Sequence, residues 1–381
     1  MKVCVSVWGR FHAFNLAQQL QNRGYLQKLI STYPAFAITK YGIDQKLIHS
    51  LWQLEALSRG WYKLPRWMRG DRNLQLWFLE QFDRSVTNYL SPEFDLFVGW
   101  SGSNYWSVHR AKELGAKTII ERGSSHMHYQ TEILTEEYEK WGLSFTETHP
   151  GIYEREIQAY DEADRIAIAS LFVKRTFLAQ GIPESKLILV PYGTSLAEFY
   201  PVAKQDNIFR VIHCGSLSLR KGVQYLLQAF WELNLPNAEL WLVGSITPEI
   251  KPFIAKYQSD RILIKGTHPQ QKLRWFYSQC SVFSLASIED GFGMVIPQAM
   301  ACGLPVIHTT NTGGEDIVRN GIDGFSIPIR DIEALKAKIL FFYENPDKRD
   351  EMGKNALAQA RQSLTWDDYG EKITNAYLQI C

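Results

Sequence analysis

The stretch from residue 282 to residue 308 reads VFSLASIEDGFGMVIPQAMACGLPVIH and decides the class of fold. Its apolar run Val282–Leu285 predicts a strand, and a glycine-rich turn follows it. A helical segment then ends near Gly303, and Pro305–His308 predicts a second strand. A strand, a helix and a strand in succession are typical of a parallel sheet covered by helices.

The same alternation extends through the rest of the chain. An amphipathic helix is expected where Val223, Leu226, Leu227 and Phe230 recur at helical spacing. Further strands are expected at Phe209–His213, Glu239–Val243 and Arg261–Ile264 in the second half, and at Val3–Val7, Leu29–Ser31, Leu96–Gly99, Thr118–Glu121, Ile166–Ala169 and Leu187–Val190 in the first. We therefore predict an α/β protein of two doubly wound domains, with a hinge near Leu196–Asn207.

The composition excludes several classes of protein. The chain has 381 residues, of which 45% are hydrophobic and 21% charged, so a disordered, collagen-like or disulfide-scaffold protein is excluded. No apolar run approaches the ~18 residues of a membrane-spanning helix. The start of the chain, Met1–Val7, alternates like a strand and is not expected to be a signal peptide. Five scattered cysteines without a CxxC pair predict a reduced, cytoplasmic protein with no structural zinc.

The net charge of +1 conceals an uneven distribution. Residues 1–75 hold 11 Lys and Arg against 3 Asp and Glu, residues 76–200 hold 11 against 18, and residues 201–381 hold 19 of each. Within residues 46–78, tryptophan alternates with cations, which is typical of interfacial helices on anionic membranes. The alternative is that the aromatic rings fill the core of the first domain while the cations reach outward. The residues concerned are Lys46, Trp52, Arg59, Trp61, Tyr62, Lys63, Arg66, Trp67, Arg69, Arg72, Trp77 and Phe78.

The first candidate site is the segment from His213 to Gly222. In open α/β sheets, ligands bind beyond the carboxyl ends of the strands, and here a strand ends before Arg220 and Lys221 precede a helix. Cations at a helix N-terminus are disfavoured unless an anion is bound there, so this arrangement indicates a phosphate site. The alternative is a pair of solvated surface cations.

The second candidate site is the turn in the opening stretch. Glu289 and Asp290 precede Gly291-Phe292-Gly293, and glycines allow backbone N–H groups to approach a ligand closely. Asp290 and Gln298 are eight residues apart, or ~12 Å on a helix, the length of a sugar with a diphosphate and part of a ribose. The alternative is a tight turn whose acids cap the helix.

The two motifs together resemble those of the retaining GT-B glycosyltransferases of glycosyltransferase family 4. The similarity extends through most of residues 150–381, and Tyr160–Ile166, Val190–Gly193, Gly313–Val318 and Trp366–Tyr377 resemble further segments of that family. The resemblance implies two facing Rossmann-like domains. Residues 1–196 would form the acceptor-side domain, joined by the returning helix of residues 366–381, and residues 197–365 would bind the nucleotide-sugar.

The resemblance also implies roles for individual residues of the second domain. Lys221 matches the diphosphate-binding lysine, Asp290 the first acid at the donor sugar, and Gln298 the second acid at the ribose. Thr267 and His268 lie where backbone groups hold the base. The family usually has two glutamates in place of Asp290 and Gln298. A glutamine can still bond a diol, but it loses the stronger charge-assisted bond.

Two further departures concern the diphosphate and the sugar. The arginine that the family has five residues before its lysine would fall at Ser216, which follows Gly215 in the same strand-end turn. Arg220 is therefore expected to be the second phosphate cation. Because aspartate is one methylene shorter than glutamate, Glu289 is expected to take part in sugar binding if Asp290 falls short.

In the first domain, His126 is the better candidate for a histidine that lines the donor sugar, and His128 the second. The alternative is a histidine packed in a polar loop. In the first strand-to-helix loop, Gly9 permits close backbone approach to the diphosphate or acceptor, and Arg10 or His12 is expected to face the cleft. An ordinary first turn remains the alternative.

The leading hypothesis is a retaining transfer of a sugar to a glycan or lipid-linked acceptor in surface polysaccharide or glycolipid synthesis. A UDP-sugar donor is expected, with UDP-N-acetylhexosamine as one candidate. No metal or other cofactor is expected, because Arg220, Lys221 and the N–H groups near Gly291–Gly293 would stabilise the leaving diphosphate. The expected location is cytoplasmic, with an anionic membrane surface as a candidate partner of residues 46–78. No nucleic-acid motif is recognised, so nucleic acid is not an expected partner.

Two alternatives stay open. One is a nucleotide-sugar epimerase or phosphorylase on a similar fold. The other is a catalytically weak or silent sugar-nucleotide-binding protein, which the replacement of both glutamates favours. An NAD-dependent dehydrogenase is disfavoured because no GxGxxG follows the first strand.

Overall fold

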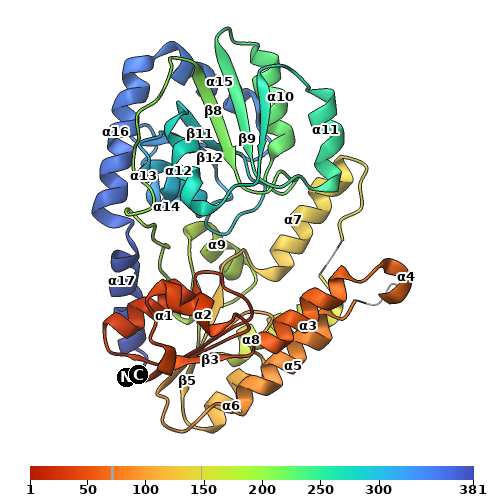
Figure 1. The fold of residues 1–381 in the computed structure, drawn as a ribbon, viewed down its shortest axis with the longest axis vertical. Coiled ribbons are helices and arrows are strands. Elements are labelled where there is room, and N and C mark those ends of the chain that lie inside the picture. The colour runs from red at the N-terminus through yellow and green to blue at the C-terminus, as the bar shows by residue number, and fades with distance from the viewer. Residues whose placement is uncertain (70–72, 147) are drawn as a thin grey trace.

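The computed structural model describes residues 1–69, 73–146 and 148–381, and within helix α4 (Arg66–Arg69) the side chain of Arg66 is not described. It contains two units, each built on a parallel sheet with helices on both faces (Figure 1). The first sheet has seven strands in the order β3-β2-β1-β4-β5-β6-β7, and the second has six in the order β10-β9-β8-β11-β12-β13. The predicted architecture of two doubly wound α/β domains is confirmed.

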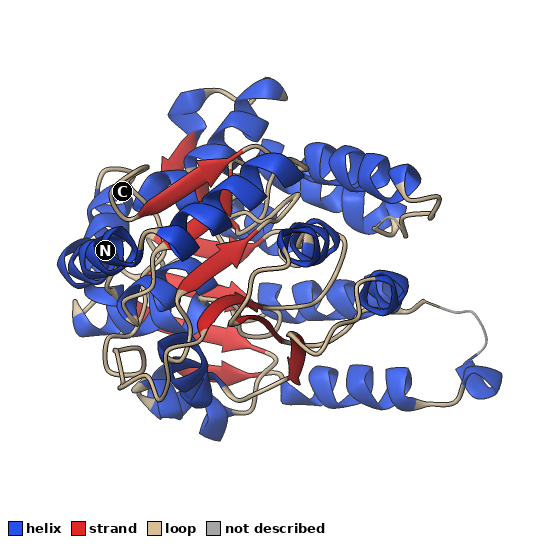
Figure 2. Ribbon diagram, turned by 90° about the horizontal axis from the view of Figure 1, so that it is seen from above, coloured by secondary structure: helices blue, strands red, loops and turns tan. Residues whose placement is uncertain are grey.

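The strands of the first sheet are β1 (Val3–Val7), β2 (Leu26–Ser31), β3 (Ile48–Ser50), β4 (Leu96–Trp100), β5 (Lys117–Arg122), β6 (Arg165–Ile168) and β7 (Leu187–Leu189). Those of the second are β8 (Phe209–Cys214), β9 (Ala238–Val243), β10 (Ile262–Gly266), β11 (Val282–Leu285), β12 (Val306–Thr309) and β13 (Gly324–Ile327). Central strands such as β1 and β11 are buried along their whole length, as expected for sheets covered on both faces. Figure 2 shows the strands flanked by helices on both sides.

The helices of the first half are α1 (Ala13–Asn22), α2 (Ala35–Ile38), α3 (Trp52–Lys63), α4 (Arg66–Arg69), α5 (Gln75–Thr87), α6 (Trp106–Glu113), α7 (Met127–Lys140), α8 (Pro150–Glu162) and α9 (Leu171–Ala179). Those of the second half are α10 (Val223–Leu233), α11 (Lys251–Lys256), α12 (Gln270–Ser278), α13 (Val295–Ala301), α14 (Gly314–Ile317), α15 (Ile332–Glu344), α16 (Pro346–Ser363) and α17 (Trp366–Leu378). In the part of the chain that the structure describes, no helix is both long and apolar enough to cross a membrane.

The last helix, α17, returns to the first domain. It begins with a capping box in which the Thr365 hydroxyl and the Asp368 carboxylate each bond the other residue's backbone N–H. Just before it, the N–H of Thr194 donates to the carbonyl oxygen of Leu364 at 2.7 Å, so two chain crossings lie side by side. The helix then packs against α1, with the Gln19 amide donating to Asp367 at 3.0 Å. The predicted return of the terminal helix is confirmed.

Helix α7 follows β5 of the first domain but is bound to the second domain, and Figure 1 shows it reaching toward α11. Its Glu137 is fully buried, and one carboxylate oxygen accepts bonds from Gln224 and Tyr225 of α10, both at 2.8 Å. The other oxygen accepts a bond from Arg330 at 2.7 Å. The two domains are thus joined along a helix as well as by the segment that links β7 to β8.

Candidate functional site

The two sheets direct their carboxyl edges toward each other, and the candidate residues of the second domain gather at this junction. Lys221 follows β8, Asp290 follows β11, and the Lys221 ammonium forms an ion pair with the Asp290 carboxylate. The other oxygen of Asp290 accepts a bond from the N–H of Gly293 at 3.1 Å. Both side chains remain partly accessible. The structure therefore brings together the cation and the acid that the two motifs supplied separately.

The turns around this pair require glycine. Gly215 has a φ of 135° and Gly293 a φ of 76°, in the left-handed region that other residues rarely adopt. A Cβ added to Gly215 would meet only the His213 ring, 3.8 Å away, so the space beside this turn is open. Half-buried Ser216 follows it. Backbone N–H groups at such turns can bind the oxygens of an anion.

Gln298 and the loop after β10 lie at the same sheet edge. Gln298 is on α13 and is largely buried, and its side-chain oxygen accepts a bond from the Tyr277 hydroxyl at 3.4 Å. Thr267 is exposed beyond β10. The His268 ring lies 4.4 Å from the ring of Phe276, with one ring nitrogen 2.9 Å from the carbonyl oxygen of Lys265. The loop can therefore present backbone groups and Thr267 to a ligand.

Glu289 does not reach this surface, and the structure corrects its expected role. Its carboxylate is fully buried and accepts bonds from the Ser125 N–H at 3.0 Å and hydroxyl at 2.8 Å, from Gln130 at 2.9 Å and from Arg220 at 2.8 Å. Hydrogen-bond donors of the protein therefore occupy the Glu289 carboxylate oxygens, which would otherwise accept hydrogen bonds from the hydroxyls of a sugar. Arg220 also extends to the Ser124 hydroxyl at 3.4 Å, so this guanidinium joins the two domains.

His126 is also placed differently from the expectation. Its side chain is buried between Tyr160 and Phe177, with ring centroids 5.2 and 4.9 Å away. One ring nitrogen accepts the bond of the His128 N–H at 3.2 Å and so caps α7. The loop after β5 turns inward here because α9 covers it. His126 is therefore a packed polar-loop histidine, as the alternative interpretation held, while His128 is exposed.

Burial and neighbouring charges set the protonation states near the site. Burial alone would raise the pKa of Glu289, but the Arg220 charge and the bonds from Gln130 and Ser125 lower it to about 2. Burial, reinforced by the charge of Lys221, lowers the pKa of His213 to about 4. Burial likewise lowers the pKa of His126 to about 4. The carboxylate is thus ionised and both imidazoles are neutral near pH 7.

The first loop of the chain reaches the junction through a row of rings. Gly9 has a φ of 84°, and nothing lies within 4 Å of a Cβ placed on it. His12 is buried, with one ring nitrogen 3.1 Å from the Glu121 carboxylate. Its ring lies 4.0 Å from that of Tyr192, which in turn lies 5.2 Å from that of Phe292. Contact therefore runs from the β1 loop to the glycine turn after β11.

Sequence reasoning missed some of these neighbours. The Tyr192 hydroxyl is buried, and it has no partner among the described residues. It points to the backbone of Gly123, since a Cβ there would lie 3.4 Å from it. The Val190-Pro191-Tyr192-Gly193 segment was recognised only as an approach to the hinge. Phe292 is buried as a whole residue, and its carbonyl oxygen accepts a bond from the Gly313 N–H at 3.0 Å.

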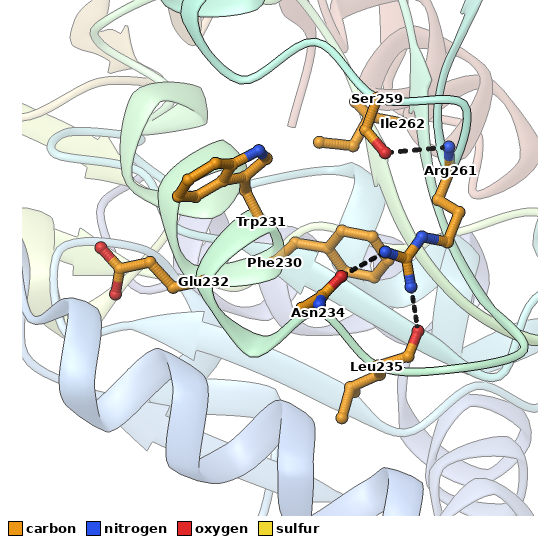
Figure 3. Close-up of a pocket in the computed structure, with 8 residues that line it drawn as sticks. All are labelled: Phe230, Trp231, Glu232, Asn234, Leu235, Ser259, Arg261 and Ile262. Carbon is orange, nitrogen blue, oxygen red and sulfur yellow. Dashed lines mark hydrogen bonds between the residues drawn. The ribbon is translucent and has the colours of Figure 1, made fainter.

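A separate pocket lies at the opposite edge of the second sheet. Figure 3 shows it between the end of α10 and the start of β10, with Trp231, Asn234 and Arg261 among its lining residues. Arg261 donates to the carbonyl oxygen of Leu235 at 2.7 Å and to the side chain of Asn234. The strands of the parallel sheet begin at the edge where this pocket lies, whereas the junction of the two domains lies at the edge where the strands end. The pocket is therefore separate from the junction.

The aromatic and basic segment of residues 46–78 includes α3 and α4, which form an arm of the first domain. Figure 1 shows α4 far from both sheets at the tip of this arm. Trp67 is 83% exposed there, and the other large exposed hydrophobic side chains of residues 46–78 are Trp52, Leu57, Tyr62, Met68 and Trp77. Phe78, by contrast, is buried in the core. Arg72 lies outside the described residues.

Comparisons with known proteins agree with this fold. Residues 198–359 match the family described as "Glycosyl transferases group 1", which covers less than half of the chain. An uncharacterized glycosyltransferase of Methanocaldococcus jannaschii is 29% identical over 222 residues, 58% of this chain and 61% of that relative. A capsular polysaccharide biosynthesis glycosyltransferase of Staphylococcus aureus, CapM, is 26% identical over 58% of this chain and 63% of its own length. The chain thus spans less than two thirds of these first relatives.

Similarity to solved structures covers the whole chain. Sucrose-phosphate synthase of Thermosynechococcus elongatus superposes with a TM-score of 0.76 at 20% identity, covering 100% of this chain and 99% of that one. HepE of Anabaena, in complex with UDP and glucose, gives a TM-score of 0.70 at 16% identity with both chains fully covered. The fold is that of GT-B glycosyltransferases. The group 1 domain and this fold together support a GT-B glycosyltransferase.

Proposed function

We propose that this protein transfers a sugar from a nucleoside-diphosphate sugar to an acceptor held by the first domain. The observation that carries the proposal is the meeting of Lys221, Asp290 and the glycine turns at the carboxyl edge of the group 1 domain. A cation at a glycine turn beyond the end of a strand suits a diphosphate. An acid next to it suits the hydroxyls of a sugar.

The proposed donor is a UDP-sugar. Gln298 would bond the ribose hydroxyls, and Thr267 and His268 would hold the base. Support for uridine comes from HepE, whose structures contain UDP or UDP-glucose. Because a similar enzyme of Corynebacterium glutamicum is named as GDP-mannose-dependent, the base has to be tested directly.

The proposed chemistry is that of a retaining family 4 enzyme. Breaking the bond from the anomeric carbon to the diphosphate places negative charge on the leaving oxygen. Lys221, with Arg220 beside it, and the N–H groups of Gly291–Gly293 would stabilise that charge without a metal. The acceptor would attack from the face that the diphosphate leaves, and the diphosphate would take its proton. Closure of the domains would exclude water.

Lys221→Ala tests the diphosphate assignment. Isothermal titration with UDP-glucose, UDP-N-acetylglucosamine and GDP-mannose first identifies the donor, and release of free nucleotide then reports turnover. Lys221→Ala is expected to abolish turnover and keep the circular dichroism spectrum. Lys348→Ala is the matched control, because Lys348 is an exposed lysine of α16 in the same domain. Unchanged turnover in Lys221→Ala would refute the assignment.

The proposed acceptor is a glycan or a lipid-linked glycan, and the arm would bring the protein to the membrane that holds it. The exposed Trp67 and Met68 at the tip, with Arg59 and Lys63 on α3, combine apolar and cationic groups as interfacial helices do. Relatives named for capsular polysaccharide, lipopolysaccharide and phosphatidylinositol mannoside synthesis support an acceptor of this kind.

Co-sedimentation with lipid vesicles tests the arm. We expect binding to phosphatidylglycerol vesicles that falls with salt, and little binding to phosphatidylcholine vesicles. Trp67→Ala should weaken binding. Trp231→Ala should not, although Trp231 is also 51% exposed, because it lies in the second domain. Equal retention of Trp67→Ala and unmodified protein would exclude the arm as the contact surface.

A further inference from the structure

Arg220 and Glu289, which the sequence points to as donor-binding residues, meet each other at the boundary between the domains. Glu289 belongs to the second domain, yet Ser125 and Gln130 of the first domain supply three of the bonds to its carboxylate, at 3.0, 2.8 and 2.9 Å. Arg220 supplies the remaining one at 2.8 Å. We call Ser125, Gln130, Arg220 and Glu289 the Glu289 bridge.

The bridge is stable only when complete. An ionised carboxylate in a protein interior is costly unless paired charges and hydrogen bonds replace its water. Here one cation and three hydrogen-bond donors do so, and the cation comes from the same domain as the carboxylate. If the first domain moved away, Glu289 would keep only Arg220. Water would have to enter, or the side chain would have to turn, and the residues that follow it would move as well.

The residues that follow Glu289 form the loop Asp290–Gly293, which is packed against the first domain. A Cβ added to Gly291 would lie 2.0 Å from the carbonyl oxygen of Gly123, so the two backbones are in direct contact. The Ser170 hydroxyl donates to the carbonyl oxygen of Gly291 at 2.5 Å. The first domain therefore supports this loop at Glu289 and again at Gly291.

We propose that Glu289 is a positioning residue, through which the loop Asp290–Gly293 takes its donor-binding shape only when the first domain is docked. The inference rests on the proposed function, because it takes this loop as the donor site. Donor binding in the second domain and docking of the first are then coupled. Docking of the first domain must raise the donor affinity of the second by the same factor by which the donor favours docking, so loss of a contact that supports docking weakens donor affinity by up to that factor.

Substitutions in the first domain alone test this coupling. Gln130→Met removes the amide but keeps the size of the side chain, and Ser125→Ala removes one hydroxyl. Gln130 also accepts a bond from Arg122 at 3.0 Å, so Ser125→Ala is the milder variant if Gln130→Met folds poorly. The control is Gln228→Met, which removes an exposed bond from Gln228 to Glu232 within α10. Circular dichroism verifies the fold of each variant.

The measurements are the dissociation constant for UDP-glucose by titration calorimetry and the radius of gyration by small-angle X-ray scattering. We expect Gln130→Met to raise the dissociation constant about ten-fold, as the loss of a bond to a charged group predicts. The radius of gyration should increase without ligand and fall again when UDP-glucose saturates the site. Ser125→Ala should behave in the same way with a smaller change, and Gln228→Met should match the unmodified protein.

A purely local role for Glu289 predicts a different result. Unchanged affinity and an unchanged radius of gyration in both variants, while the unmodified protein binds UDP-glucose, would overturn the bridge and leave the proposed function intact. Failure of the unmodified protein to bind UDP-glucose, UDP-N-acetylglucosamine or GDP-mannose would overturn the proposed function, and the donor role of the bridge with it.

Discussion

Truncation of Glu137 tests how firmly α7 holds the two domains together. The Glu137→Ala variant removes the acceptor of Tyr225 and Trp141 and breaks the buried ion pair with Arg330. Gln224 keeps only its bond to the Leu219 carbonyl oxygen at 3.2 Å. Removing one partner of a buried ion pair costs about 3 to 5 kcal/mol. Arg330 keeps its bond to Glu136 at 2.7 Å and is itself partly accessible, so we expect the lower end, about 3 kcal/mol.

Thermal unfolding measures this effect, and the neighbouring glutamate supplies the control. For a chain of 381 residues that unfolds as one unit, ~3 kcal/mol lowers Tm by about 4 °C. Glu136 bonds the same arginine from the same helix, but its side chain is 62% exposed. Glu136→Ala should therefore cost less than about 1 kcal/mol, or ~1 °C. If both variants lower Tm equally, the buried carboxylate does not carry the contact between α7 and the second domain.

Three further predictions concern the junction. Gly291→Ala should abolish turnover and expand the protein in small-angle scattering, because its methyl group would collide with the Gly123 carbonyl; an active, compact variant would refute the close contact. Asp316 accepts bonds from the Leu171 N–H, and burial raises its pKa from 3.8 to about 6. The folded state therefore binds more protons than the unfolded state between those values, so this group's contribution to stability falls as pH rises from about 4 to 6. In Asp316→Asn, the free energy of unfolding from urea curves should lose this part of its pH dependence between about pH 4 and 6. If the free energy of unfolding of Asp316→Asn depends on pH as that of the unmodified protein does, the raised pKa of Asp316 is contradicted. Gln298→Glu restores a charge-assisted bond to ribose and should lower the UDP dissociation constant about three-fold in calorimetry, whereas unchanged or weaker binding would remove Gln298 from the ribose site.

The sequence predicted all the interior strands of the two sheets but only two of the four edge strands, at Leu187–Val190 and Arg261–Ile264. Val3–Val7 and Val282–Leu285 were predicted with the observed bounds, because continuous apolar runs mark strands covered on both faces. The two strands that were missed, Ile48–Ser50 and Gly324–Ile327, lie at the ends of their sheets. An edge strand has one neighbour and needs little apolar surface, so its sequence pattern is weak.

In the candidate site, the backbone pattern was more informative than the roles of the side chains. Gly215 and Gly293 adopt left-handed conformations at strand ends, and Lys221 meets Asp290, because these features follow from the order of strand, turn and helix. His126 and Glu289 are turned inward by contacts from α9 and from Ser125, far away in the sequence. Burial of that kind depends on the tertiary fold, which one sequence does not display.

The case of Arg220 explains why charge at a strand end was an ambiguous signal. A cation beside a helix N-terminus needs an anion, and the sequence predicted that this anion is a bound phosphate. The anion in the structure is the Glu289 carboxylate, held by the first domain, and Lys221 is the neighbouring cation with an accessible partner. The same electrostatic argument is satisfied by a bound diphosphate or by a docked domain. In a protein whose domains close over a ligand, adjacent residues of one motif can serve both purposes, one binding the diphosphate and the other docking the domain. The Lys221 variant tests diphosphate binding, and the Gln130 variant tests docking.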